Sequence, residues 1–172
     1  MVKNIKKIFK FRAFRGFIIA EPLIILVTTT ALVTPMLLQN KQPSPVKTCV
    51  SNQRQLATAV LMYTYENDEI YPEADDIWNS VGVRGKVLKC PSDKNRADAA
   101  YAYNANIANS SIEALKNPEE IVISADSDRE DNLMTSVADV VKRHKENNVV
   151  ISFADGHVKA VSEYSLNFVK FK

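Results

Sequence analysis

The stretch that decides the fold lies near the end of the chain and reads VVISFADGHVKAV, residues 149–161. Two apolar runs, Val149–Ala154 and His157–Val161, flank Asp155-Gly156, a two-residue turn of the type I′ kind, which is a strong signal for a β-hairpin. Side chains alternate between the two faces of a strand, so one face of the first strand carries Val149, Ile151 and Phe153. The pattern predicts an antiparallel hairpin with this face in the core.

An amphipathic helix is predicted upstream, from Thr48 to about Asn67. Its apolar side chains recur every three to four residues among polar ones, at Cys49, Leu56, Ala59, Val60, Tyr63 and Tyr65. Such a face has to pack on a partner, and further strands of a small sheet are predicted at Val87–Lys89, Ala100–Asn104 and Ile121–Ala125. Short helices are expected after Ser110-Ser111 and over Thr135–Lys142. The expected fold class is α+β.

Length and charge narrow the class of protein. The chain has 172 residues, enough for one ordinary domain with an appendage, and its 46% apolar content excludes wholesale disorder. Residues 1–15 carry six basic side chains and no acidic one, so the remainder has 16 basic against 20 acidic groups, a net charge of −4. A nucleic-acid binder keeps its positive excess on the folded part, so no nucleic-acid partner is expected.

A single membrane span is predicted directly after this basic segment. Phe17 to Leu38 are 22 residues whose only formal charge is Glu21. A helix of this length reaches about 33 Å, which matches a hydrocarbon core of about 30 Å. The basic flank is expected to stay in the cytoplasm, which places the rest of the chain outside it. Residues 39–47 contain two prolines and are predicted to be a hinge before a globular domain at 48–172.

The start of this span resembles the type III signal of prepilins and pseudopilins, in the stretch Arg15-Gly16-Phe17-Ile18-Ile19-Ala20-Glu21. In that family a membrane-embedded peptidase cuts after the Gly and N-methylates the new terminal Phe. The resemblance therefore implies a leader peptide at residues 1–16, with cleavage and methylation at Gly16 and Phe17. It also implies an assembly role for Glu21, whose carboxylate can pair with the buried α-amino group of a neighbouring subunit. A plain signal anchor is the alternative.

The globular half is similar to the prepilin-type domain named for His-x(nine)-Asp-Gly. The resemblance rests on Cys49-x-x-Asn52, Cys90-Pro91-Ser92, Tyr101-x-Tyr103-Asn104, Ala125-Asp126-Ser127 and the motif residues His144, Asp155, Gly156 and His157. Ten residues separate His144 from Asp155 here, one more than in the pattern, with the extra residue expected at Asn147-Asn148. The resemblance implies a pilin-like fold, in which a long N-terminal membrane and assembly helix packs on a small antiparallel β-sheet.

The two resemblances together imply a structural subunit and not an enzyme. It would sit in the bacterial inner membrane as a single-pass protein, N-terminus in the cytoplasm, and build a type II secretion pseudopilus or a type IV-like filament. The implied partners are prepilin peptidase, further copies of the pseudopilin subunit, the inner-membrane secretion platform and the membrane itself. Two alternatives stay open: an anchored extracytoplasmic binding or sensing domain that never polymerises, and an anchored hydrolase that uses His144 or Asp155.

Cysteines and acidic residues are the remaining candidates for site chemistry. Cys49 and Cys90 lie in the part expected outside the cytoplasm, where disulfides persist, so a bond between them is predicted, with two separate thiols as the alternative. The histidines and aspartates follow no zinc signature, so no metal or other cofactor is expected. Major pseudopilins of the resembled type bind calcium in a loop, and the corresponding candidates are Asp126, Asp128 and Asp131. A solvated acidic loop is favoured over that calcium site.

Overall fold

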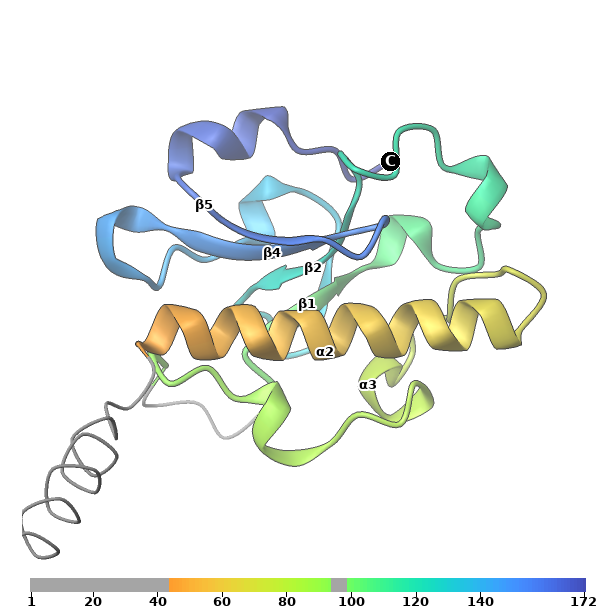
Figure 1. Cartoon of the computed structure of the whole chain (residues 1–172), viewed down its shortest axis with the longest axis horizontal. Coiled ribbons are helices and arrows are strands. Elements are labelled where there is room, and N and C mark those ends of the chain that lie inside the picture. Colours follow the sequence, from red (N-terminus) through yellow and green to blue (C-terminus); the bar gives the residue numbers. More distant parts are fainter. Residues whose placement is uncertain (1–43, 94–98) are drawn as a thin grey trace, which may run out of the picture. The chain divides into compact units, whose positions relative to one another are not determined.

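The computed structural model describes residues 44–93 and 99–172, so the expected leader, membrane span and most of the hinge lie outside the described residues. The described residues form one compact unit of the α+β class, in which one long helix packs on a five-stranded mixed sheet (Figure 1). Within those two described ranges, no helix is both long enough and apolar enough to cross a membrane.

Helix α2, Pro45–Glu66, begins at a serine cap. Ser44 Oγ accepts a hydrogen bond from the Lys47 N–H, and Pro45 occupies the first turn, where its missing N–H is not needed. The helix ends before Asp68, which adopts a φ of 54°. Residues 45–47 therefore belong to the helix, and the predicted hinge boundary was three residues too late.

The buried face of α2 differs from the predicted one at its C-terminal end. The helix buries one stripe of side chains, namely Cys49, Asn52, Gln53, Leu56, Ala57, Val60 and Thr64. Tyr65 is 68% exposed and Tyr63 is only half-buried, so their expected place in the core was wrong. Thr64 can take the buried position because its hydroxyl donates to the Val60 carbonyl at 2.8 Å.

The sheet has the strand order β3-β1-β2-β4-β5. Its strands are β1 Tyr101–Asn104, β2 Val122–Asp126, β3 Leu133–Met134, β4 Val149–Phe153 and β5 Val158–Val161. All neighbours are antiparallel except β1 and β3, which pair in parallel, so the expected purely antiparallel sheet is corrected to a mixed one. The predicted strands over β1, β2, β4 and β5 are confirmed.

Several expected elements are short 3₁₀ turns. The strand predicted at Val87–Lys89 was wrong. The chain there forms the 3₁₀ turn η1, Gly85–Leu88, which begins at a left-handed Gly85 and ends where the Lys89 N–H donates to the Lys86 carbonyl. The remaining helical elements are α3 Ile77–Ser80, η2 Ala105–Ile107, η3 Ile112–Ala114, η4 Val137–Asp139, η5 Lys145–Asn147 and η6 Glu163–Phe168. The two helices predicted after Ser110-Ser111 and over Thr135–Lys142 are η3 and η4.

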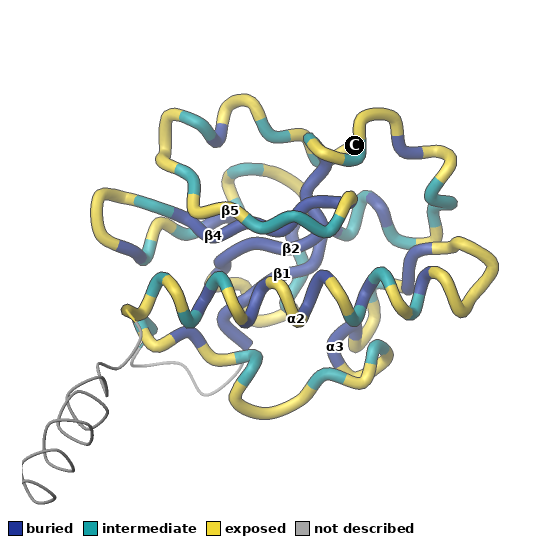
Figure 2. Tube along the Cα trace, viewed as in Figure 1, coloured by how far each residue is buried: buried dark blue, intermediate teal, exposed yellow. Residues whose placement is uncertain are grey.

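Both faces of the sheet are covered. On one face, Val150 of β4 packs in a core cluster with Leu56 and Val60 of α2. On the other face, Val149, Ile151 and Phe153 pack in a second cluster with Leu166 of η6. Figure 2 shows β1, β2 and β4 as buried along their length and the edge strand β5 as partly exposed, with α2 on one side of the sheet and the C-terminal segment on the other. The shared face of Val149, Ile151 and Phe153 is confirmed, but the opposite face is buried as well.

The predicted hairpin is present with a different turn. The Gly156 N–H donates to the Phe153 carbonyl at 2.8 Å, and the Phe153 N–H donates to the His157 carbonyl at 3.0 Å. Only Gly156 has a positive φ, 87°, so the type I′ prediction, which needs two such residues, was wrong. The loop has three residues, a turn followed by a left-handed glycine. Asp155 favours it because its carboxylate accepts the His157 N–H at 3.0 Å.

A polar cluster joins α2 to the sheet within the core. Gln53 is fully buried, its side-chain oxygen accepts from the Ser124 hydroxyl, and its amide donates to the Val150 carbonyl at 3.4 Å. The Ser124 and Ser152 hydroxyls lie 2.7 Å apart. Because every member has a partner, the cluster can be buried without an unsatisfied polar group, and it fixes the position of the helix over β2 and β4.

Candidate functional site

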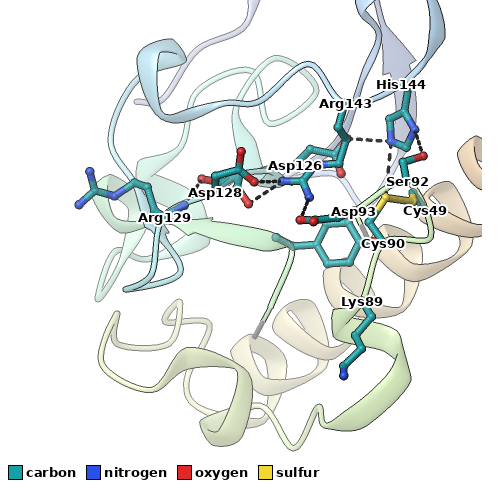
Figure 3. Close-up of polar contacts among 12 residues, drawn as sticks. Cys49, Lys89, Cys90, Ser92, Asp93, Asp126, Asp128, Arg129, Arg143 and His144 are labelled. Atoms are coloured by element: carbon teal, nitrogen blue, oxygen red, sulfur yellow. Dashed lines mark hydrogen bonds and ion pairs between the residues drawn. A yellow bond between two sulfur atoms is a disulfide. The ribbon is translucent and has the colours of Figure 1, made fainter. Parts of the chain in front are cut away.

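A disulfide between Cys49 and Cys90 lies at the centre of a buried region that contains polar side chains. Cys49 lies in the first turns of α2 and Cys90 follows η1, and their Cα atoms are 5.6 Å apart (Figure 3). Both residues are buried. Asn52, one turn further along α2, donates to the Lys89 carbonyl at 2.9 Å. The segment before Cys90 is therefore attached to the helix by a covalent bond and by a hydrogen bond.

His144 lies against this disulfide. Its side chain is fully buried, and its Nε2 is 4.0 Å from Cys90 Sγ. The same nitrogen is 3.1 Å from Asp126 Oδ2, while Nδ1 is 3.2 Å from Ser92 Oγ (Figure 3). A carboxylate can only accept, so Nε2 carries the proton toward Asp126. The imidazole is thus held at both ring nitrogens with one edge toward sulfur.

Asp126 ends β2 and is fully buried. Its Oδ2 accepts the Val150 N–H at 2.7 Å in addition to the imidazole, whereas its Oδ1 is buried with no hydrogen-bond partner in the described part of the chain. Burial raises the pKa of the nearby Tyr101 phenol far above its usual range, and the Asp126 carboxylate raises it further. Tyr101 therefore stays neutral beside this carboxylate.

Arg143, next to His144, fastens the same segments together. Its guanidinium binds Asp93 Oδ2 at 2.5 Å, Asp128 Oδ1 at 2.8 Å and the Ser127 carbonyl at 2.7 Å. The Arg143 side chain is only 7% exposed, so these charge-assisted bonds lie largely out of water. The pair Arg143-His144 connects the segment after Cys90 to the end of β2.

The predicted calcium ligands do not converge on one point. Asp126 faces His144, Asp128 pairs with Arg143, and Asp131 pairs with Arg129 at 2.6 Å. The Arg129 pairing lowers the pKa of Asp131 below its usual range. Within residues 44–93 and 99–172, a different set lies close enough to hold a metal ion: one ligand atom each of Cys49, Cys90 and His144, all within 4.8 Å of one another.

The motif residues occupy the two ends of β4. His144 precedes the strand, whereas Asp155, Gly156 and His157 form the loop after it, and five residues at about 3.3 Å each separate the ends by about 16 Å. In the loop, His157 Nδ1 lies 2.5 Å from Asp155 Oδ1, and its ring stacks on Phe153 at 4.2 Å. These contacts organise the hairpin. The motif residues therefore belong to two separate local structures, one around His144 and one in the loop after β4.

The predicted site residues Gly16, Phe17 and Glu21 lie outside the described residues.

Ser92, His144 and Asp126 form a chain of hydrogen bonds. A hydroxyl, an imidazole and a carboxylate follow one another in it, as they do in a catalytic triad. Acyl transfer also needs space beside the hydroxyl and donors for an oxyanion. Two hollows on the described surface lie elsewhere, one beside Trp78 and Asn132 and the other beside Lys142 and Tyr164. The chain of hydrogen bonds therefore orients the imidazole.

Comparison of the chain with protein-family models, with curated proteins and with solved structures gives no match. The argument for function thus rests on the sequence and on the geometry described above.

Proposed function

We propose that the chain is a pseudopilin-like structural subunit. It is made as a precursor in the bacterial inner membrane, cut after Gly16 by prepilin peptidase, and assembled through its N-terminal helix into a type II secretion pseudopilus or a type IV-like filament. The observation that carries the proposal is the pair Gly16-Phe17 with Glu21 four residues further on, behind a basic leader and at the start of a 22-residue apolar stretch.

The role of Glu21 follows from electrostatics. A lone carboxylate in a bilayer costs about 2.5–3.5 kcal/mol on insertion scales, so a glutamate in an apolar span is usually retained for a purpose. Cleavage at Gly16 creates a new α-amino group at Phe17. When apolar helices pack in a filament, Glu21 of one subunit can pair with that amino group of the next, which removes two isolated buried charges.

The rest of the chain is compatible with an extracytoplasmic domain. The described α+β unit starts with a long helix only six residues after the apolar stretch. The bonded pair Cys49 and Cys90 suits an oxidising compartment. Both features support the proposed topology, in which the basic N-terminus stays in the cytoplasm.

The first test is the N-terminus of the protein in membrane fractions. Intact mass and N-terminal sequencing should find a chain that starts at Phe17 and carries one extra methyl group. Gly16→Leu should leave the full-length precursor, because the peptidase must approach a backbone with no Cβ at the scissile bond. Ala20→Leu, a bulky change inside the same stretch, is the matched control and should still be cut. A wild-type chain that still starts at Met1 would remove the proposal.

The second test separates a filament subunit from an anchored binding or sensing domain. Glu21→Ala should leave membrane insertion intact and abolish incorporation into sheared filaments or crosslinked oligomers. Glu66→Ala, at the exposed end of α2, removes a glutamate outside the apolar stretch and should assemble normally. If Glu21→Ala assembles as well as wild type, the anchored domain becomes the better account.

A further inference from the structure

Two aromatic side chains of η6 are exposed together. Tyr164 is 78% exposed and Phe168 is 70% exposed, and their rings meet edge to face with centroids 6.3 Å apart. Leu166, between them in the sequence, is buried in the core cluster on the sheet face opposite α2, so it fixes η6 with both aromatic rings turned to the outside. Large apolar side chains that are exposed as a group indicate an interaction surface.

These aromatic residues lie at the end of the domain where α2 begins. Val161, the last residue of β5, pairs with Val149, the first residue of β4, and η6 starts two residues after Val161. The η5 turn follows His144, which lies against the disulfide in the first turns of α2. The start of α2, the η5 turn and the start of η6 therefore share one end of the domain, on the left in Figure 1.

Exposed lysines lie beside the aromatic pair at this end. Lys47 is in the first turn of α2 and Lys145 is in η5, and none of the ion pairs between described residues includes either of them. Lys142 pairs with Glu163, whereas Glu146 is an exposed acid next to Lys145. Aromatic rings next to lysines are typical of protein surfaces that lie at a membrane–water interface.

The length of chain before α2 keeps this end close to the predicted membrane span. Six residues, 39–44, separate that span from α2, and six residues reach at most about 22 Å. We propose that this end of the domain docks on the extracytoplasmic surface of the membrane that holds the span, with Tyr164 and Phe168 in the interface. The inference rests on the membrane anchor of the proposed function, and it does not require cleavage or filament assembly.

The tether makes so small a patch sufficient. Two aromatic side chains bury little area, but a short linker gives a tethered domain an effective concentration in the millimolar range, so weak docking becomes populated. The other end of α2 is then held away from the bilayer. A helix rises about 1.5 Å per residue, so Tyr65 lies about 27 Å along the axis from Lys47. Tyr65 is 68% exposed, which makes it a matched position for comparison.

Quenching of tryptophan fluorescence by lipid tests the docking. Full-length protein with Tyr164→Trp is reconstituted at fewer than one copy per vesicle, in ordinary phospholipid and in phospholipid brominated on its acyl chains. The emission of wild type, which comes from the buried Trp78, is subtracted. We expect brominated lipid to remove most of the added signal, and the emission to lie at shorter wavelength than that of Tyr65→Trp. The signal of Tyr65→Trp, the matched control, should not be quenched.

Second-site changes in the Tyr164→Trp protein test the rest of the patch. Phe168→Ser should lower the ratio of docked to free domain by about threefold to tenfold. Lys145→Gln should lower it by about fivefold in vesicles of anionic phosphatidylglycerol, and less in zwitterionic vesicles. Lys116→Gln removes an exposed lysine that lies outside the three segments, and it should leave the ratio unchanged. Circular dichroism shows whether each variant is folded.

Failure of the docking can be distinguished from failure of the proposed function. Resistance of wild type to extraction from the vesicles at alkaline pH tests the anchor separately. If the protein is anchored but Tyr164→Trp is quenched no more than Tyr65→Trp, the docking is overturned and the anchor stands. A protein that does not insert overturns both. A wavelength shift of Tyr164→Trp that lipid does not quench, and that grows with the number of copies per vesicle, would assign the patch to a second copy of the chain and overturn the docking as well.

Discussion

Gly156 carries two separate constraints. Its φ of 87° is a conformation that other residues resist, and a Cβ at this position would meet Leu61 Cδ1 of α2 at 3.1 Å. We expect Gly156→Val to destabilise the protein by about 1–3 kcal/mol and to lower its melting temperature by several degrees, measured by thermal unfolding. Cleavage at Gly16 should be unaffected.

A matched pair of variants separates the two constraints. Gly82 also has a positive φ, 73°, but a Cβ there would meet no atom within 4 Å. Gly82→Ala therefore reports the backbone strain alone, and Gly156→Ala adds the contact with Leu61. Identical melting of Gly156→Val and wild type would show that the β4–β5 loop does not have the described conformation.

Asp139 stabilises the 3₁₀ turn η4 by accepting hydrogen bonds. Its Oδ2 accepts the Thr135 N–H at 2.9 Å and the Ser136 N–H at 3.2 Å, and Arg129 lies near Oδ1. The backbone bond from Thr135 is the main reason that the pKa of Asp139 falls below its ordinary value of 3.8. A carboxyl with a lowered folded-state pKa contributes stability that is complete above its unfolded value and is lost as pH falls through the folded value.

Asp139→Asn should therefore be less stable than wild type at neutral pH, and the difference should shrink as pH falls below about 3.8. Denaturant unfolding at several pH values measures it. Glu119→Gln, a change at an exposed carboxylate, is the control and should show little difference at any of these values. A difference between Asp139→Asn and wild type that is constant with pH would show that the ionised carboxylate is not what holds η4.

Among the secondary-structure elements, strands marked by an apolar run or by a turn signal were predictable, and a strand of two residues was not. The strands β2 and β4 follow from such runs, whereas β3 has only two residues and lacks a pattern to detect. Polar residues misled the prediction for α2, because Gln53 and Thr64 look solvent-facing in sequence. Each is buried with a hydrogen-bond partner that is defined only by the fold or by the helix itself.

The candidate site was predictable only in part, for a related reason. The chain has two cysteines in a part that is expected outside the cytoplasm, which indicates the Cys49–Cys90 pair. No sequence spacing links His144 to this pair, since Cys90 and His144 are 54 residues apart. Asp126 was predicted as a calcium candidate from its acidic neighbours, whereas the sheet places it against an imidazole. The Cys90-Pro91-Ser92 and Ala125-Asp126-Ser127 motifs and the motif residue His144 were the sequence signals for the residues that make these contacts.

Across the domain, the disulfide attaches the first helix to the segment after η1. The cysteines are 41 residues apart, so the bond constrains the unfolded chain by about 4 kcal/mol in the loop-entropy treatment. Cys90→Ser should lower the free energy of unfolding by a few kcal/mol, measured with urea on the full-length protein without reductant. Wild type in reductant and in a metal chelator should fall to a similar stability. Two reactive thiols in the unreduced wild type would contradict the prediction.

The packing of α2 on β4 has a consequence for synthesis of the chain. Gln53 and Val150, which are hydrogen-bonded in the fold, are 97 residues apart. At about 5–20 residues per second, the ribosome completes that interval in about 5–20 s, during which the apolar stripe of the helix lacks β4 to cover it. A nascent chain that stops before the hairpin should therefore be a good substrate for holding chaperones and for proteases. Completion of the last strands would end that exposure in one cooperative step, so the C-terminal residues set the moment at which the domain becomes resistant to degradation.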